Sequence, residues 1–229
     1  MSGALQAIIF DFDGVIANSE PLHLMAFQHV LQSAGVELTP ADYYARYLGF
    51  DDEGVFEAIA RDRGLAMSAA DVAGLVTRKG DRMEEMLHSG SVLFPGAIEF
   101  IREAAAAVPI GIASGALRHE ILEIITGAGA ANLFSTVVAS GDTPRSKPSP
   151  EPYRLAFEQL CASAGRRLDP RCSVAIEDSR WGLESAQGAG LRLVGVTTSY
   201  PAHELAGAEL IVSGLDGLTL AALDRLCAA

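Results

Sequence analysis

Two aspartates two residues apart, Asp11 and Asp13, follow the short apolar run ALQAIIF near the start of the chain. Side chains two apart on a strand point to the same side, so both carboxylates come together where the strand ends. Like charges this close favour a neutralising cation, and carboxylate oxygens suit Mg²⁺. An isolated Asp-x-Asp is nevertheless more often a solvated strand end. A calcium loop is excluded, because Val15, Ile16 and Leu22 stand where that loop needs an acid, a glycine and a glutamate.

Polar residues also follow three later apolar runs. PIGIAS ends in Ser114, and Gly115 follows it. The Ser114 hydroxyl and the backbone N–H groups at the start of the next helix suit a phosphate. SVAIED ends in the acidic pair Glu177 and Asp178, and Lys147 lies in SKPSP between another run and a helix. Each residue alone has an ordinary explanation, such as a helix cap or a surface lysine. Together, the four strand ends predict one site.

The acids of this site form a predicted magnesium shell. One oxygen of Asp11, the backbone carbonyl of Asp13, Glu177 and Asp178 would supply its protein ligands, with water and a substrate phosphate in the remaining positions. The acidic pairs at two strand ends therefore predict Mg²⁺ as the cofactor.

The same site predicts phosphoryl transfer. Asp11 would attack phosphorus with its other oxygen, and Asp13 would protonate the leaving oxygen and then activate the water that cleaves the acyl phosphate. Lys147, Ser114 and the Gly115 amide would stabilise the phosphoryl oxygens as charge develops.

The elements that carry these residues alternate between strands and helices. This alternation predicts an α/β fold with a doubly wound, Rossmann-like parallel sheet. The predicted strands are the apolar runs at 4–10, 109–114, 135–140, 173–178, 192–197 and 208–213. The predicted helices between them are 96–107, 117–128, 150–163 and 180–189.

One segment interrupts the alternation after the first strand. Residues 20–88 contain no strand pattern, only amphipathic stretches near 21–34, 41–47, 52–63 and 69–88. An all-helical insertion here would form a cap over the carboxyl edge of the sheet, where open α/β sheets bind ligands. We therefore predict a catalytic core at 1–17 and 91–229 and a helical cap domain at 18–90, joined near 16–19 and 89–94.

Composition limits the functional class. The 229 residues are 49% hydrophobic, enough for a substantial core, and the formal net charge of −12 argues against nucleic acid. Cys161, Cys172 and Cys227 fit neither a disulfide framework nor a zinc site. The N-terminus does not resemble a signal peptide, and no apolar run reaches the ~20 residues that span a bilayer. We predict a soluble, cytoplasmic monomer that acts on a small phosphorylated metabolite and does not bind membranes.

Four motifs give the chain a wider resemblance. DFDGVIANSEPLH, IASG, SKPSP and IEDSRWGLESAQGAG resemble, in order and spacing, the motifs of the haloacid dehalogenase-like superfamily. The chain is most similar to its phosphatase and β-phosphoglucomutase branch, which has a helical cap after the first motif. The resemblance implies an aspartyl-phosphate mechanism. Dehalogenases and phosphonoacetaldehyde hydrolases of this superfamily lack an aspartate at the position of Asp13. The resemblance therefore does not favour either of these activities.

The resemblance also suggests cap residues that contact the substrate. His23 and Lys79 fall where β-phosphoglucomutases place residues near the acid/base aspartate and the sugar. Asp52 stands where those mutases carry an arginine that grips a second phosphate, although Arg46 could take that role if the alignment shifts. The roles of Arg46 and Arg78 stay open.

Three functions remain. The leading prediction is a magnesium-dependent phosphatase, favoured by the complete site and the missing phosphate clamp. A hexose phosphomutase resembling β-phosphoglucomutase is the alternative, and product identity separates the two. A non-enzymatic phospho-acceptor module is a remote third possibility, because such a module needs no helical insertion. The exact substrate is not fixed by the sequence.

Overall fold

The computed structural model describes residues 4–48, 50–87 and 92–228, which form two compact units. Unit 1 comprises the chain up to Asn18 and from Leu93 onward, and unit 2 comprises Ser19–Val92. The units divide at 18/19 and 92/93, where the sequence prediction placed the domain boundaries at 17/18 and 90/91. The predicted joint residues 89–91 lie outside the described part of the chain.

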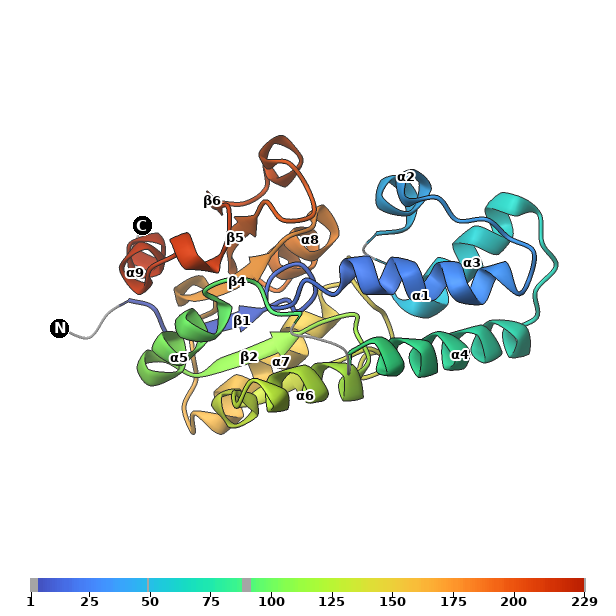
Figure 1. Cartoon of the computed structure of the whole chain (residues 1–229). Helices are drawn as coiled ribbons and strands as arrows, with labels where there is room; N and C mark the ends of the chain where they lie inside the picture. The colour runs from blue at the N-terminus through green and yellow to red at the C-terminus, as the bar shows by residue number, and fades with distance from the viewer. Residues whose placement is uncertain (1–3, 49, 88–91, 229) are drawn as a thin grey trace. The chain divides into compact units, whose positions relative to one another are not determined.

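Unit 1 is built on one six-stranded parallel sheet (Figure 1). Its strands lie in the order β3-β2-β1-β4-β5-β6, so the chain moves outward from the centre in both directions. This is the doubly wound arrangement predicted from the alternating pattern, and the fold-class prediction is confirmed. The strands are β1 (Ala7–Phe10), β2 (Ile110–Ala113), β3 (Thr136–Val138), β4 (Ser173–Glu177), β5 (Arg192–Val196) and β6 (Leu210–Val212).

Helices cover both faces of the sheet, which explains why its central strands are apolar throughout. On one face, Tyr153 and Leu160 of α7 and Leu183 of α8 pack into a core that includes Ile9 of β1. On the other face, the rings of Phe10 and Phe100, the latter from α5, lie 6.2 Å apart. The helices of unit 1 are α5 (Ala97–Ala107), α6 (Arg118–Gly127), α7 (Glu151–Ser163), α8 (Arg180–Gly188) and α9 (Leu220–Ala228).

The described residues of unit 2 form helices joined by loops and contain no strand. Asp51 caps α3 by accepting a 2.8 Å hydrogen bond from the Gly54 N–H, and Gly64 ends that helix in the left-handed conformation. The buried side chains of α4 include Val72, Leu75 and Met83. Its helices are α1 (Glu20–Gln32), α2 (Pro40–Asp42), α3 (Asp52–Arg63) and α4 (Ala69–Leu87), with a π-helical turn at Tyr43–Tyr47.

Two features differ from the sequence prediction. The helix predicted at 41–47 is divided, because the Leu48 N–H bonds to the Tyr43 carbonyl at 3.0 Å in the i→i+5 pattern of a π-helix. Helix α9 was not predicted, although its apolar residues Leu220, Leu223 and Cys227 recur at helical spacing, and Leu223 and Cys227 are buried.

The two chain segments that leave and re-enter unit 1 lie side by side. Ala17 forms an antiparallel bridge with Leu93, and the Phe94 N–H donates to the Ile16 carbonyl at 3.0 Å. The insertion therefore begins and ends at one place on unit 1. Among the described residues, no helix combines the length and apolarity needed to cross a membrane.

Candidate active site

The predicted site residues of unit 1 meet at the carboxyl edge of the sheet. Asp11 follows β1 directly, and its N–H donates to the Ile176 carbonyl of the neighbouring β4 at 2.9 Å. Glu177 ends β4 and Asp178 follows it, while Ser114 follows β2 on the other side of β1. Parallel strands end on the same edge, so local sequence patterns bring these side chains together.

Lys147 joins this group from the loop between β3 and α7. Its Nζ donates to Asp11 Oδ1 at 2.6 Å and to Glu177 Oε1 at 2.6 Å. The same ammonium lies 5.0 Å from the centre of the Tyr153 ring. A lysine that would be ordinary on a surface therefore sits in an ion pair with two acids, one of which is the predicted nucleophile.

Burial and charge strongly perturb the group. Burial raises the pKa of Asp11 to about 8; the nearby Lys147 opposes this, and the Glu177 and Asp13 carboxylates add to it. Burial lowers the pKa of Lys147, but the charges of Asp11 and Glu177 outweigh burial, so its pKa is raised. The cluster therefore holds more negative charge than its lysine can neutralise.

This charge surplus and the ligand chemistry fit a hard divalent cation. Asp11, Glu177 and Asp178 are buried and each offers a carboxylate oxygen, all within 4.8 Å of one another. Oxygen-only donor sets of this kind suit Mg²⁺ or Ca²⁺ rather than softer metals. Asp13, the fourth predicted ligand, lies half-buried in the turn after β1 and pairs with Ala17.

Two glycines allow the acids to approach this closely. Gly14 has φ +79°, and a Cβ there would lie 1.8 Å from Asp178 Oδ2. A Cβ on Gly182 of α8 would lie 1.9 Å from Glu177 Oε1. Any larger side chain at these positions would displace a predicted metal ligand, so the glycines are part of the construction of the site.

Ser114 and Gly115 lie where a phosphate-binding strand end was predicted. Ser114 is buried, and its Oγ accepts a hydrogen bond from the Ala116 N–H at 3.0 Å. Gly115 is exposed, with no atom within 4 Å of the position that a Cβ would take. The roles of both residues toward a phosphate stay predictions.

The sequence reasoning missed three residues that hold the acids. Tyr153 donates to Glu177 Oε1 at 2.8 Å, and Ser179 donates through its hydroxyl to Glu177 Oε2 at 3.1 Å. Ser199 donates to Asp178 Oδ2. Tyr153 could have been found, because it lies in the first turn of the predicted helix at 150–163, on the same buried stripe as Ala156 and Leu160. Ser179 and Ser199 carried no comparable signal.

The predicted cap residues lie in unit 2 and contact one another. His23 Nδ1 is 2.7 Å from Lys79 Nζ, and both side chains are buried. Lys79 also pairs with Asp52 at 3.0 Å. Arg46 bonds to Asp62 at 2.6 Å, and Arg78 donates to the Ser33 hydroxyl at 3.3 Å.

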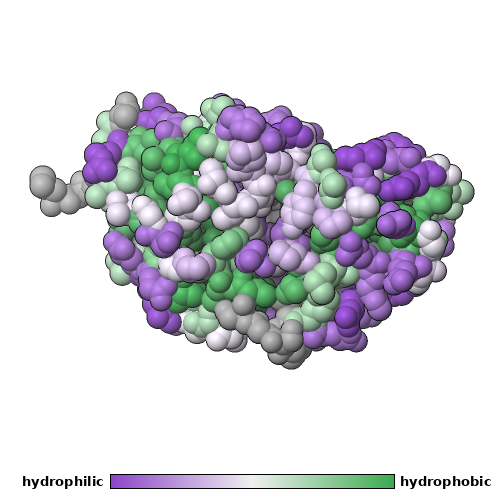
Figure 2. Space-filling view, turned by 45° about the horizontal axis from the view of Figure 1, so that its top comes forward, coloured by the Kyte–Doolittle hydropathy of each residue, from purple (hydrophilic) through white to green (hydrophobic). Residues whose placement is uncertain are grey.

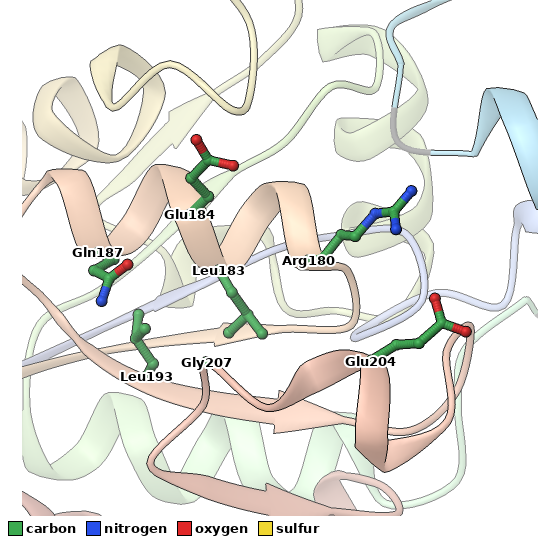
Figure 3. Close-up of a pocket in the computed structure, with 7 residues that line it drawn as sticks. All are labelled: Arg180, Leu183, Glu184, Gln187, Leu193, Glu204 and Gly207. Atoms are coloured by element: carbon green, nitrogen blue, oxygen red, sulfur yellow. The ribbon is translucent and has the colours of Figure 1, made fainter.

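A hollow of about 420 Å³ lies elsewhere in unit 1, between α8, β5 and the segment around Glu204, and Figure 3 shows the residues that line it. It contains none of the predicted site residues. Its lining is Arg180, Leu183, Glu184, Gln187, Leu193, Glu204 and Gly207.

The chain is similar to proteins named CbbY and to named phosphatases. Protein CbbY of Rhodobacter capsulatus is 33% identical over 204 residues, covering 86% of this chain and 87% of that protein. A phosphorylated carbohydrates phosphatase of Thermotoga maritima is 27% identical over 196 residues, covering 85% of this chain and 87% of that protein. A crystal structure of mutant CbbY from Rhodobacter sphaeroides in complex with xylulose-1,5-bisphosphate has a TM-score of 0.86 and 27% identity, covering 96% of this chain and 99% of that one.

A family model confirms the family that the four motifs predicted. The model of haloacid dehalogenase-like hydrolases matches residues 8–196, which include all of the strand-edge acids and Lys147. Relatives within this family are named phosphatases. Because the match spans most of the chain, this protein belongs to the haloacid dehalogenase-like hydrolase family.

Proposed function

We propose that this chain is a magnesium-dependent phosphatase that hydrolyses a small phosphorylated metabolite, such as a sugar phosphate, through a phosphoaspartate at Asp11. One observation carries the proposal: Lys147 Nζ lies 2.6 Å from Asp11 Oδ1 in a buried cluster with Glu177 and Asp178. A nucleophile, a cation and metal-ligating acids at one sheet edge are what phosphoryl transfer requires. The names of the relatives support a phosphorylated carbohydrate as the substrate class.

Four residues would hold the metal in this proposal. They are Asp11, Glu177 and Asp178 through their carboxylates and Asp13 through its backbone carbonyl. Bound Mg²⁺ would supply positive charge that offsets the charge of these acids and of the substrate phosphate.

The side chains of Asp11 and Asp13 would carry out the chemical steps. Lys147 donates a hydrogen bond to Asp11 Oδ1, so the attacking oxygen would be Oδ2. Its bond to phosphorus forms while the bond from phosphorus to the ester oxygen breaks, and Asp13 gives the departing oxygen a proton. Asp13 then takes a proton from water, and that water oxygen displaces Asp11 from phosphorus. Inorganic phosphate and the free Asp11 carboxylate result.

Lys147, Ser114 and the Gly115 amide would stabilise the phosphoryl oxygens during both steps. Their contribution depends on orientation set before the substrate arrives. For Lys147 this orientation comes from Glu177, whose Oε1 accepts from both Lys147 at 2.6 Å and Tyr153 at 2.8 Å. Glu177 would thus serve Lys147 as well as the metal.

Unit 2 would act as the cap, covering the substrate and contacting its leaving group. This role follows from the place of the insertion, directly after the strand that carries Asp11. Closing a site over a phosphoryl group excludes water other than the hydrolytic one and strengthens its electrostatic interactions.

Measurement of phosphate release tests the proposal. Purified protein with Mg²⁺ should liberate inorganic phosphate from p-nitrophenyl phosphate and from members of a sugar-phosphate panel, and EDTA should stop the reaction. Asp11→Asn should abolish release while its thermal unfolding remains cooperative. Absence of metal-dependent hydrolysis with every ester would overturn the proposal. Conversion of β-glucose 1-phosphate to glucose 6-phosphate with little free phosphate would indicate a mutase instead.

A further inference from the structure

The segment that follows β5 contributes two hydroxyl groups to the carboxyl edge of the sheet. Ser199 donates through Oγ to Asp178 Oδ2, and Thr198 donates through Oγ1 to the Gly14 carbonyl. Strand β5 lies beside β4 in the sheet, so the residues after both strands come to the same edge. The segment therefore reaches two turns that carry predicted metal ligands, the turn after β1 and the turn after β4.

Backbone hydrogen bonds hold this segment in place. Strand β5 pairs with β4 in a register that sets Gly195 opposite Glu177, and the Thr197 N–H donates to the Val212 carbonyl of β6 at 3.0 Å. The two hydroxyls belong to the next two residues of the chain. All of these residues lie in unit 1. The sheet therefore sets the positions of both hydroxyls, and these positions do not depend on where unit 2 lies.

The Ser199 hydroxyl limits the orientation of the Asp178 carboxylate. Asp178 is buried, and a Cβ on Gly14 would lie 1.8 Å from its Oδ2 and 2.9 Å from Ser199 Oγ. The three residues are thus packed closely at one point, where the hydrogen bond from Ser199 restricts the side-chain torsions of Asp178. Because a hydroxyl is a neutral donor, it orients the carboxylate and leaves its negative charge for a cation.

The Thr198 hydroxyl acts on the turn after β1. Within this turn the Gly14 N–H donates to the Ala17 carbonyl at 2.8 Å, and Thr198 holds the Gly14 carbonyl. Because a peptide group is planar and trans, the direction of the Gly14 N–H also sets that of the Asp13 carbonyl, which points the opposite way. The peptide groups on both sides of Gly14 are therefore fixed by hydrogen bonds.

We propose that Ser199 and Thr198 are positioning residues for the metal site, which orient the Asp178 carboxylate and the Asp13 carbonyl before Mg²⁺ binds. The inference rests on the proposed function, in which these two groups are ligands of the metal. Side chains that hydrogen-bond to metal ligands raise metal affinity, because the ligands then lose less conformational freedom on binding. A cationic side chain in the same place would orient the carboxylate but would also repel the metal.

Magnesium affinity, measured without turnover, tests this role. Isothermal titration calorimetry of the full chain, freed of metal with EDTA and then dialysed, gives the Kd for Mg²⁺. Ser199→Ala should raise this Kd by about tenfold, and Ser199→Thr, which keeps a hydroxyl, should restore it. Thr198→Val should raise the Kd by a smaller factor, because its hydroxyl acts one peptide group away from the ligand. Thr198→Ser should restore it.

The titration has to separate the strand-edge site from weak binding at the surface. The net charge is −12, and hydrophilic residues occupy much of the visible surface in Figure 2. Titration in about 0.15 M KCl weakens the attraction of Mg²⁺ to exposed carboxylates, whereas a buried site is screened much less. The site that disappears in Asp178→Asn is the one whose Kd is compared among the variants.

Ser173→Ala is the matched control, because it removes another serine hydroxyl from the same part of the sheet. Ser173 is buried and donates to the Asp169 carbonyl at 2.9 Å, at the opposite end of β4 from Asp178. Its loss should lower the unfolding temperature as Ser199→Ala does, but should leave the Kd for Mg²⁺ unchanged. The comparison separates orientation of a metal ligand from a general loss of stability.

Thr198→Val carries the test if Ser199→Ala folds poorly, because Thr198 is exposed. Absence of phosphate release from every ester contradicts the phosphatase proposal, while the titrations still test the two hydroxyls. An unchanged Kd in both hydroxyl-deleting variants, no recovery in both hydroxyl-retaining ones, an equal rise in Ser173→Ala, or no Mg²⁺ site in the unaltered protein overturns the inference.

Discussion

Tyr153 is buried and is not one of the predicted site residues, but it holds one of them, Glu177, in place. Its hydroxyl donates to Glu177 Oε1 at 2.8 Å, and that oxygen also accepts from Lys147. Burial, together with the charges of Glu177 and Asp11, raises the pKa of Tyr153 well above its usual value. The phenol therefore stays protonated and remains a donor, which keeps Glu177 turned toward Lys147.

Tyr153→Phe removes this donor without changing the packing of the ring. We expect the free energy of unfolding to fall by about 1.5–3 kcal/mol, as for other hydrogen bonds to charged groups. The kcat for phosphate release should fall about tenfold because Lys147 loses orientation, with little change in KM. Chemical denaturation and steady-state kinetics measure the two effects.

Tyr44→Phe provides the matched control, because Tyr44 is exposed and lies in unit 2. It should alter neither quantity. If Tyr153→Phe destabilised the protein but left kcat intact, Tyr153 would have only a structural role.

At the scale of elements, the loop between β3 and α7 positions Lys147. Asp142 accepts from the Ala139 N–H at 2.8 Å at the start of the loop. At its end, Glu151 of α7 accepts from the Arg145 backbone N–H at 3.0 Å and from Arg145 Nε at 2.8 Å. Hydrogen bonds from Arg145 lower the pKa of Glu151, so the Glu151 carboxylate is ionised at neutral pH. The Glu151–Arg145 pair thus acts as a clamp at this end of the loop. The loop is fixed on both sides of Lys147.

Glu151→Gln weakens the clamp at one end of this loop. The pair is exposed, so we expect little change in the unfolding temperature. Small displacements of a catalytic group reduce turnover, so kcat should fall about fivefold. Differential scanning fluorimetry and phosphate release measure the two quantities.

Glu209→Gln is a suitable comparison, because Glu209 also accepts from an arginine and from a backbone N–H, those of Arg192 and Leu193. It should leave kcat unchanged. Equal losses of kcat in the two variants would show that the clamp does not act through Lys147.

At the scale of the molecule, the chain carries an excess of negative charge, part of which is buried at the strand edge. The net charge is −12, and three buried carboxylates share the strand edge with one lysine. This surplus destabilises the folded state unless a cation is bound, because buried like charges repel. Folding and metal binding are therefore expected to be coupled.

Added Mg²⁺ should stabilise the protein against heat. At a concentration one hundred times its Kd, linkage predicts about 2.7 kcal/mol, equivalent to a rise of about 5–10 °C in the unfolding temperature. Scanning calorimetry with Mg²⁺, and with NaCl at equal ionic strength as the control, measures this rise. An equal rise in both salts would argue against a specific site at Asp11 and Asp178.

Much of the fold and the strand-edge site could be predicted because the relevant information is local. Apolar runs ending in Asp11, Ser114 and Glu177 identify strands and the chemistry at their ends, and a parallel sheet must bring those ends to one edge. The alternation of strands and helices likewise located the helical insertion. Helix α9 follows the last strand, outside the alternation of strands and helices, and was not predicted.

What the sequence determined by itself was the set of candidate site residues in unit 1 and the sheet edge on which they meet. The tertiary structure decided their partners: Tyr153 for Glu177, Ser199 for Asp178, and Asp52 with His23 for Lys79. These pairings join side chains from elements far apart in the chain. They depend on how helices and loops pack, and residue type and spacing alone do not specify that packing.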